Sequence, residues 1–377
     1  MKVIGKGEFS QQISDYVLSS FPKVAAFQKS SLLEALTEIM IGNKDKRYGS
    51  IPKPESQVVI RETIRRAIDK NVPIPVLIPW GGRKTDENLS VDMAEISALK
   101  QILCLNQTVR LVYPPGLRIH VRIEDLNAEW LYKTNTGVEE YSSAMVKLIN
   151  ILKGETLISA IRESDMMNRD EYFFIAHGYV WDLVNTITQL ENFPDSKLEK
   201  ITSYQNLIKR GWKGTFPKEQ RDYYLHRYKK LYPHSTEPSR IAMLADYFAG
   251  AKARHDLNAK GEPKGDIESY IQINFAHPVP GAPEGMFNNT LYYRTVPESM
   301  GRTHIAPWRA KGYLKIVGNN IYSKVTSPTD DLVNLHSSFV KIEGDTEEVL
   351  VEADYMVEDY SAIMMATMMA TMMATMI

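Results

Sequence analysis

The sequence predicts an α/β protein with a Rossmann-like, mostly parallel sheet flanked by helices, and a C-terminal third that is richer in β hairpins. Residues 72–125 contain two apolar, strand-like runs separated by one amphipathic helix, which is the pattern of a parallel βαβ unit. Residues 291–324 contain short strand-like runs, and 318–320 carry a Gly-Asn-Asn hairpin signal. The 377 residues are enough for one large or two ordinary domains.

Composition limits the classes of function. The 45 basic and 46 acidic residues give a net charge of −1, which argues against a general nucleic-acid coat or a polybasic membrane protein. The single cysteine, Cys104, makes no intrachain disulfide and excludes a cysteine-rich zinc site. The first residues lead into mixed polar sequence without a long apolar run, so we expect no signal peptide and no membrane partner. A cytoplasmic location is the default expectation.

Three regions follow one another along the chain. Residues 1–58 read as a helical lead-in, because apolar side chains recur at helical spacing around 13–21 and 32–39, with Ser30 and Ser31 as candidate caps. Residues 59–345 form the expected α/β core. Residues 346–377 form a C-terminal tail that ends in a Met-Met-Ala-Thr repeat. Methionine suits adaptable apolar contacts, so this tail is a candidate oligomer contact.

The first strand of the βαβ unit, at 74–78, is followed by a glycine-rich basic turn. Ligands of open α/β sheets bind at the carboxyl ends of strands, where Gly81 to Lys84 would lie. Gly81 and Gly82 would let backbone N–H groups approach an anion, and Arg83 and Lys84 add positive charge. The spacing is not that of a P-loop. From local sequence alone, a solvated basic turn is the favoured alternative.

The second half of the unit begins with a helix at 92–105, which carries apolar side chains on one side. The next strand, 118–123, follows a Tyr-Pro-Pro-Gly turn at 113–116 and alternates, so that Arg118, His120 and Arg122 share one face. A basic row of this kind is either solvated or lines an anion pocket. Further helices are expected at 139–152 and 170–193, and further strands at 269–275, 291–296, 313–317 and 321–324.

Two other types of chemistry receive little support. The eight histidines are scattered without metal-ligand spacing, so we expect neither a metal nor another cofactor. Residues 204–232 interleave basic side chains with tyrosines, a pattern that can bind single-stranded nucleic acid by stacking. An amphipathic helix with half-buried tyrosines is the favoured explanation of that pattern, so nucleic acid is the less favoured partner.

The remaining motifs, taken in order over roughly residues 60 to 325, resemble the isocyanide (isonitrile) synthases of the pyoverdine/dityrosine biosynthesis family. The family's Phe-Pro-x-Lys-Ser strand end corresponds to 78–85, and its Tyr-Pro-Pro-Gly turn is intact at 113–116. Its Ser-Asp-Gly strand end corresponds to 124–126, its Ser-Ile-His-Pro segment to 274–278, and its Thr-Pro-Trp-His segment to 306–309. The sequence departs from the family at Gln272, where an arginine is usual, and at Arg309, which replaces a histidine.

The resemblance implies an enzyme that condenses an amino-acid amine with ribulose 5-phosphate, or a related phosphosugar, and fragments the sugar to leave an isonitrile. The residues implied for proton transfer and catalysis are Lys84, Glu124, Asp125 and His277. Those implied for substrate binding are Gly81, Gly82, Arg83, Tyr113, Arg122, Trp308 and Arg309. The alternative is a non-catalytic binding or structural protein on the same fold, whose ancestral pocket has been eroded.

Overall fold

The computed structural model describes the main elements of the expected core. The described residues are 2–4, 31–42, 54–84, 90–132, 135–153, 156–191, 236, 239, 246, 249–250, 253–254, 257, 270–275, 290–296, 305–317, 320–326, 339–343 and 346–358. The expected helix around 13–21, the basic and aromatic segment 204–232, and the methionine-rich repeat lie outside these residues.

A five-stranded parallel sheet forms the centre of the molecule, in the order β4-β3-β2-β5-β6. Its strands are β2 (Ile74–Gly81), β3 (Leu117–Glu124), β4 (Leu157–Arg162), β5 (Ile271–Asn274) and β6 (Thr290–Tyr292). The mostly parallel, Rossmann-like sheet predicted from the sequence is therefore confirmed, and β2, α4 and β3 are its predicted βαβ unit.

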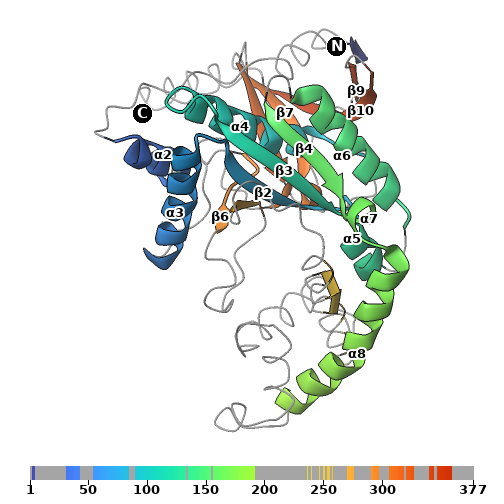
Figure 1. Ribbon diagram of the computed structural model, residues 1–377. Helices are drawn as coiled ribbons and strands as arrows, with labels where there is room; N and C mark the ends of the chain where they lie inside the picture. Colours follow the sequence, from blue (N-terminus) through green and yellow to red (C-terminus); the bar gives the residue numbers. More distant parts are fainter. Residues whose placement is uncertain are drawn as a thin grey trace, which may run out of the picture.

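Helices α4 (Met93–Arg110) and α6 (Val138–Leu152) lie on one side of this sheet (Figure 1). Their apolar side chains share one buried core with the sheet, and that core includes Ile102 of α4, Met145 of α6 and Val121 of β3. Helices α2 (Leu32–Ile41) and α3 (Pro54–Lys70) precede β2 in the chain and add to the same core, for example with Leu36 of α2 and Ile64 of α3. Ser31 caps α2 as expected, because its side chain accepts a hydrogen bond from the Glu34 N–H at 3.2 Å.

Two short helices and one long helix follow the carboxyl ends of β3 and β4. These are α5 (Asp125–Tyr132), α7 (Glu163–Met166) and α8 (Arg169–Glu191), which extends away from the end of β4 (Figure 1). The next strand of the sheet is β5, which pairs with β2. None of the described helices combines the length and the apolar character that crossing a membrane requires.

The C-terminal third is rich in antiparallel pairs, as predicted. β7 (Lys311–Val317) and β8 (Asn320–Thr326) form the expected hairpin, and β11 (Asp354–Glu358) joins β7 in parallel. β9 (Phe339–Glu343) pairs with β10 (Glu348–Glu352) and with β1 (Lys2–Ile4). The expected helical lead-in therefore begins with a strand. The region expected as a tail contains β10, whose Val349 and Val351 enter the core, and β11, whose Tyr355 packs against that core.

β2 is longer than the sequence suggests. We expect it to end at Ile78, because Pro79 has no N–H to donate within a central strand. The structure continues β2 to Gly81, with Pro79 opposite Arg122 of β3. β5 pairs only with Val76 and Leu77, so Pro79 lies beyond the part of β2 that has neighbours on both sides. The turn that we expected from Pro79 therefore begins at Gly82, three residues later.

Candidate active site

The candidate site lies at the carboxyl ends of β2, β3 and β4. β3 and β4 follow β2 on one side and β5 and β6 lie on the other, so the strand order reverses between β2 and β5. Ligands of open α/β sheets bind at such a reversal. At this place Trp80 contacts Phe275 at the end of β5, with ring centroids 5.6 Å apart, and Trp308 at 5.7 Å. Trp308 belongs to the short 3₁₀ helix η2 (Pro307–Arg309).

The two glycines at the end of β2 make room for neighbouring protein atoms. A Cβ atom on Gly81 would lie 2.4 Å from the Trp308 ring. A Cβ atom on Gly82 would lie 2.4 Å from both the Glu124 carbonyl oxygen and the Asp125 Cα. Ser142 of α6 donates a hydrogen bond to the Gly82 carbonyl at 3.1 Å. The glycines therefore allow η2 and the start of α5 to pack closely, which differs from the anion approach expected from the sequence.

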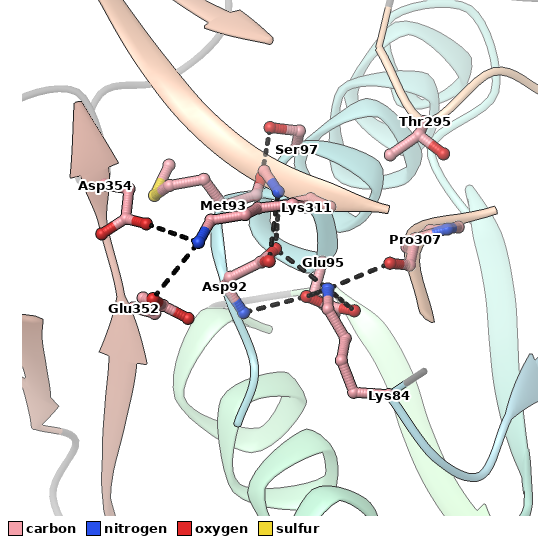
Figure 2. Close-up of polar contacts among 12 residues, drawn as sticks. Lys84, Asp92, Met93, Glu95, Ser97, Thr295, Pro307, Lys311, Glu352 and Asp354 are labelled. Carbon is pink, nitrogen blue, oxygen red and sulfur yellow. Dashed lines mark hydrogen bonds and ion pairs between the residues drawn. The ribbon is translucent and has the colours of Figure 1, made fainter. Parts of the chain in front are cut away.

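Lys84 is buried, with 1% of its surface exposed, and its ammonium group is surrounded by protein oxygens (Figure 2). Nζ lies 2.8 Å from both Glu95 carboxylate oxygens, 3.0 Å from Asp92 Oδ1 and 3.0 Å from the Pro307 carbonyl oxygen. Because this charge is already compensated, Lys84 joins the β2 turn to α4 and η2 instead of presenting its charge to solvent.

The partners of Lys84 belong to a larger buried network. Asp92 and Glu95 form the capping box of α4, in which Asp92 accepts from the Ala94 N–H at 2.7 Å. The other oxygen of Asp92 accepts from the Gly312 N–H of β7 at 3.1 Å. The Tyr141 hydroxyl donates to Glu95 at 2.9 Å and accepts from the Trp80 indole at 3.0 Å. Together with the bond from Lys84 to Pro307, this network joins five elements, β2, α4, α6, β7 and η2.

The charges in this network oppose one another. Burial raises the pKa of Glu95, and Lys84 acts against that rise. Burial lowers the pKa of Lys84, but the coulombic and hydrogen-bonding effects of Asp92 and Glu95 outweigh burial and leave that pKa raised. Every hydrogen bond described at Glu95 is donated to it, which fits the ionised carboxylate because that form has no proton to give. The charges of Lys84 and of its two acidic partners therefore stabilise one another.

A second charged group lies at the ends of β3 and β4. Arg254 forms ion pairs with Glu124 and with Glu163, the latter at 3.4 Å. Arg122 Nη2 lies 3.8 Å from Glu124 Oε1. The backbone N–H of Asn127 donates a hydrogen bond to Glu163 Oε2 at 3.3 Å. Glu163 is fully buried, and this burial raises its pKa to about 7 although Arg254 acts in the opposite direction. A carboxyl group with a pKa near neutrality can both accept and release a proton.

Asp125 is also buried, and the backbone and side chains around it occupy both of its oxygens. It accepts hydrogen bonds from Arg162 Nε at 3.0 Å, from the Ser164 N–H at 3.1 Å and from the Leu126 N–H at 3.0 Å, and it contacts the Ser164 hydroxyl. Arg162 also pairs with Glu139 of α6 at 2.7 Å. Asp125 thus joins the end of β3 to the end of β4, so its geometry suits holding the site in shape.

The structure brings most of the sequence-predicted site residues to this edge, with two exceptions. Tyr113 lies before the start of β3, and its hydroxyl is 2.8 Å from the carbonyl oxygens of Ala67 and Val72. It is therefore at the opposite end of an eight-residue strand, roughly 25 Å from Glu124. His277 lies outside the described residues.

The remaining predicted residues flank the two charged groups. Arg309 is half-buried at the end of η2. Arg83 places its guanidinium 4.6 Å above the Tyr132 ring of α5. Within the described part of the chain, the buried Nε of Arg83 has no hydrogen-bond partner.

The fold and the charged edge define an α/β protein with a mostly parallel sheet and a candidate ligand site at the carboxyl ends of its strands. Among solved structures, the chain is similar to the PvcA protein from Pseudomonas aeruginosa, with a TM-score of 0.55 and 15% identity, over 86% of this chain and 100% of that one. That likeness establishes the fold. No protein-family model matches the sequence, and no curated protein is significantly similar to it.

Two tyrosyl-tRNA synthetases complexed with L-tyrosine give weaker matches. The enzyme from Pyrococcus horikoshii has a TM-score of 0.28 at 11% identity, over 70% of this chain and 60% of that one. The enzyme from Archaeoglobus fulgidus has a TM-score of 0.26 at 11% identity, over 71% and 64%. Both TM-scores are too low to indicate a common fold.

Three charged residues of this edge, Arg162, Glu163 and Arg254, are not among those predicted from the sequence. Arg162 is the last residue of β4 and Glu163 follows it. We did not expect β4 as a strand, because its short run, Leu-Ile-Ser-Ala-Ile-Arg, has no clear polar alternation. The position of these two residues is the available signal, because a charged pair directly after the five-residue run 157–161 resembles the end of β3. Arg254 comes from a segment distant in sequence, and local spacing does not indicate its partners.

Replacing Glu163 with glutamine is expected to stabilise the protein at neutral and alkaline pH. The folded-state pKa of Glu163 is about 7, above the roughly 4.3 of an unfolded glutamate, so ionisation above that range penalises the folded state. The free energy of unfolding of the wild type should fall between about pH 4.3 and 7, and Glu163→Gln should remove much of that fall. We expect a gain on the order of 2 kcal/mol at pH 8 and almost none at pH 4.

Urea unfolding at several pH values measures this effect. Glu348→Gln, at an exposed carboxylate of β10, is the control and should leave the pH dependence unchanged. A Glu163→Gln variant that is less stable than the wild type at pH 8 would show that the ion pair with Arg254 outweighs the cost of burial.

Proposed function

We propose that the protein is an isonitrile-synthase-like enzyme, which condenses an amino-acid amine with ribulose 5-phosphate or a related phosphosugar. The observation that carries the proposal is the group formed by Arg122, Glu124, Glu163 and Arg254 at the ends of β3 and β4. It combines cations that can bind an anionic substrate with carboxyl groups that can transfer protons. The ordered motifs and the fold shared with PvcA support the same class of enzyme.

The first step of this reaction joins the amine nitrogen to the ketone carbon of the sugar. The nitrogen lone pair forms the C–N bond, the C=O electron pair moves to oxygen, and that oxygen takes up a proton and later leaves as water to give the imine. Glu124, which is partly exposed beside Arg254, is placed to accept the proton from nitrogen. Glu163 lies behind it, with Arg254 between them, and a pKa near neutrality suits it to hold a second proton.

In this proposal, the arginine side chains and η2 bind the two substrates. Arg122 and Arg309 would hold the phosphate or the carboxylate through paired N–H groups. Trp308 provides an apolar wall beside the glycines of β2. We assign Lys84 and Asp125 positioning roles in this proposal, because protein groups already surround their charges. His277 remains a proposed acid or base.

Mass spectrometry of the purified protein with ribulose 5-phosphate and a pool of amino acids tests the proposal. We expect consumption of the sugar and a product with the mass of an amino-acid isonitrile. Glu124→Gln should lower the rate about a hundredfold, since proton transfer by a positioned side chain contributes rate factors of this order. Glu348→Gln should retain the wild-type rate. If neither sugar consumption nor an isonitrile mass is found, the proposed reaction is wrong.

A further inference from the structure

Arg254, which pairs with Glu124 and Glu163, lies on a helical segment that packs at the carboxyl edge of the sheet. The structure describes six residues of this segment, and their spacing of three or four residues places them on one face of a helix. We call this face the docking face, and it consists of Asp246, Ala249, Gly250, Ala253, Arg254 and Leu257. Its alanines and its leucine are buried, so the docking face is in contact with the rest of the protein.

Two hydrogen bonds fix the position of the docking face. The Trp130 indole of α5 donates to the Asp246 carbonyl at 2.7 Å, and the Tyr172 hydroxyl of α8 donates to the Gly250 carbonyl at 3.1 Å. Asp246, Gly250 and Arg254 follow one another at intervals of four residues, so these bonds lie on the two helical turns before Arg254. Because both bonds hold backbone carbonyls, they set the point from which the Arg254 side chain leaves the helix.

Gly250 allows the docking face to pack closely. A Cβ atom on Gly250 would lie 2.8 Å from Cδ1 of the Trp130 ring, 2.9 Å from Asn127 Oδ1 and 3.0 Å from the Tyr172 hydroxyl. Trp130 and Tyr172 are buried, so they have little room to move away. A larger residue at this position would therefore push the docking face, and Arg254 with it, away from α5 and α8.

The docking contact is separate from the main core. Among the described residues, the core that α4 and α6 share with the sheet includes neither Trp130 nor Tyr172, and it includes none of the docking face. Satellite clusters of this kind open locally at a lower free energy than a main core does. The position of Arg254 therefore depends on a few local contacts, and a single substitution among them can change it.

Glu163 is the group that reports where Arg254 lies. It is fully buried, with Arg254 Nη1 at 3.4 Å and the Asn127 N–H at 3.3 Å. Burial raises the pKa of Glu163 to about 7, and Arg254 makes the largest contribution in the opposite direction. The other charged or titratable groups that act on Glu163 are Arg122, Glu124, Asp125 and Tyr172.

The geometry assigns Trp130, Tyr172 and Gly250 the role of positioning residues, which hold Arg254 against Glu163 and Glu124 through the docking face. None of the three belongs to the motifs from which the site is predicted. In the proposed enzyme, α5 and α8 would thereby set how readily Glu163 holds a proton. The inference rests on the proposed function only in that consequence, because the positioning itself is measured without turnover.

The pH dependence of stability measures the position of Arg254 through Glu163. Each protein is compared with the same protein carrying Glu163→Gln, and urea unfolding gives the difference in their free energies of unfolding from about pH 4 to about pH 9. This difference falls until the pH passes the folded-state pKa of Glu163 and is constant above it, because Glu163 is then ionised in both the folded and the unfolded state. In the wild type it should level off near pH 7.

Arg254→Gln sets the scale of the effect. Burial then acts without its main opponent, so the levelling point should move up by about one pH unit. Trp130→Phe and Tyr172→Phe each remove one donor to the docking face, and Gly250→Ala pushes this face outward without changing a polar group. Each should move the levelling point up by part of that amount. On the Arg254→Gln background, none of them should move it further.

Gly178→Ala is the matched control, because an added Cβ atom at this exposed position of α8 has no neighbour within 4 Å. It should level off where the wild type does. If Gly250→Ala and Tyr172→Phe level off with this control, or if their shifts persist on the Arg254→Gln background, the inference is wrong. A downward shift also contradicts it, because the docking face would then only shield Glu163 from water. If the expected shifts appear but no isonitrile forms, the positioning stands and the proposed reaction fails.

Discussion

Lys84→Met is expected to lower the free energy of unfolding by about 3–5 kcal/mol, the cost of removing one partner from a buried ion pair. Methionine fits the space of the lysine stem but leaves Asp92 and Glu95 buried without their cation. It also removes the hydrogen bond to the Pro307 carbonyl, which fixes η2. Chemical unfolding followed by circular dichroism measures the change.

The loss should depend on pH in a defined direction. Without Lys84, the main opposition to the effect of burial on Glu95 is lost, so the folded-state pKa of Glu95 rises further above its unfolded value and the variant should recover stability as the pH falls from 8 to 5. Lys147→Met, at an exposed position of α6, is the control and should change stability little. If Lys84 instead serves mainly to grip a substrate anion, Lys84→Met will match Lys147→Met in stability and lose only binding.

Gly82→Ala is expected to destabilise the protein by about 3 kcal/mol, the upper end of the usual cost of overpacking. The added methyl group would lie 2.4 Å from the Glu124 carbonyl oxygen and the Asp125 Cα, which are backbone atoms and cannot rotate away. The ends of β2 and β3 would have to separate. Glu124 would move with them, so activity should fall together with the melting temperature.

Gly178→Ala is the matched control for this substitution. Gly178 is exposed in the middle of α8, and an added Cβ atom has no neighbour within 4 Å. Alanine should therefore stabilise this helix by about 1 kcal/mol through its higher helix propensity. Equal melting temperatures for Gly82→Ala and the wild type would show that the strand ends can separate at little cost.

The sequence predicts the centre of this fold well, because the helices and strands there have a regular hydrophobic periodicity. The helix expected at 92–105 is α4, and the hairpin predicted from the Gly-Asn-Asn signal at 318–320 is formed by β7, which ends at Val317, and β8, which begins at Asn320. The regular alternation of 118–123 correctly places Arg118, His120 and Arg122 on one face of β3. In each case a local pattern determines the structure, so a local interpretation is sufficient.

The roles of the charged residues are harder to predict, because they depend on contacts between distant segments. Lys84 follows two glycines and an arginine, and nothing nearby in the sequence indicates that Pro307 and the cap of α4 surround it. Glu163 is missed because β4 has no clear alternation. Tyr113 is misleading for the opposite reason, since its motif is intact but its hydroxyl faces backbone carbonyls at the far end of β3.

The connection between α4 and the C-terminal strands has a consequence for the order of folding. The Glu352 N–H donates to the Val91 carbonyl at 3.0 Å. Asp354 of β11 forms an ion pair with Lys311 of β7 at 3.1 Å, as Figure 2 shows. Contacts this distant in sequence close large loops and slow folding. During synthesis, the first turn of α4 and the acids around Lys84 therefore stay exposed to water until residues 352–354 have left the ribosome and can pack against them. The βαβ unit is an early part of the chain, but the candidate site at its edge is completed late.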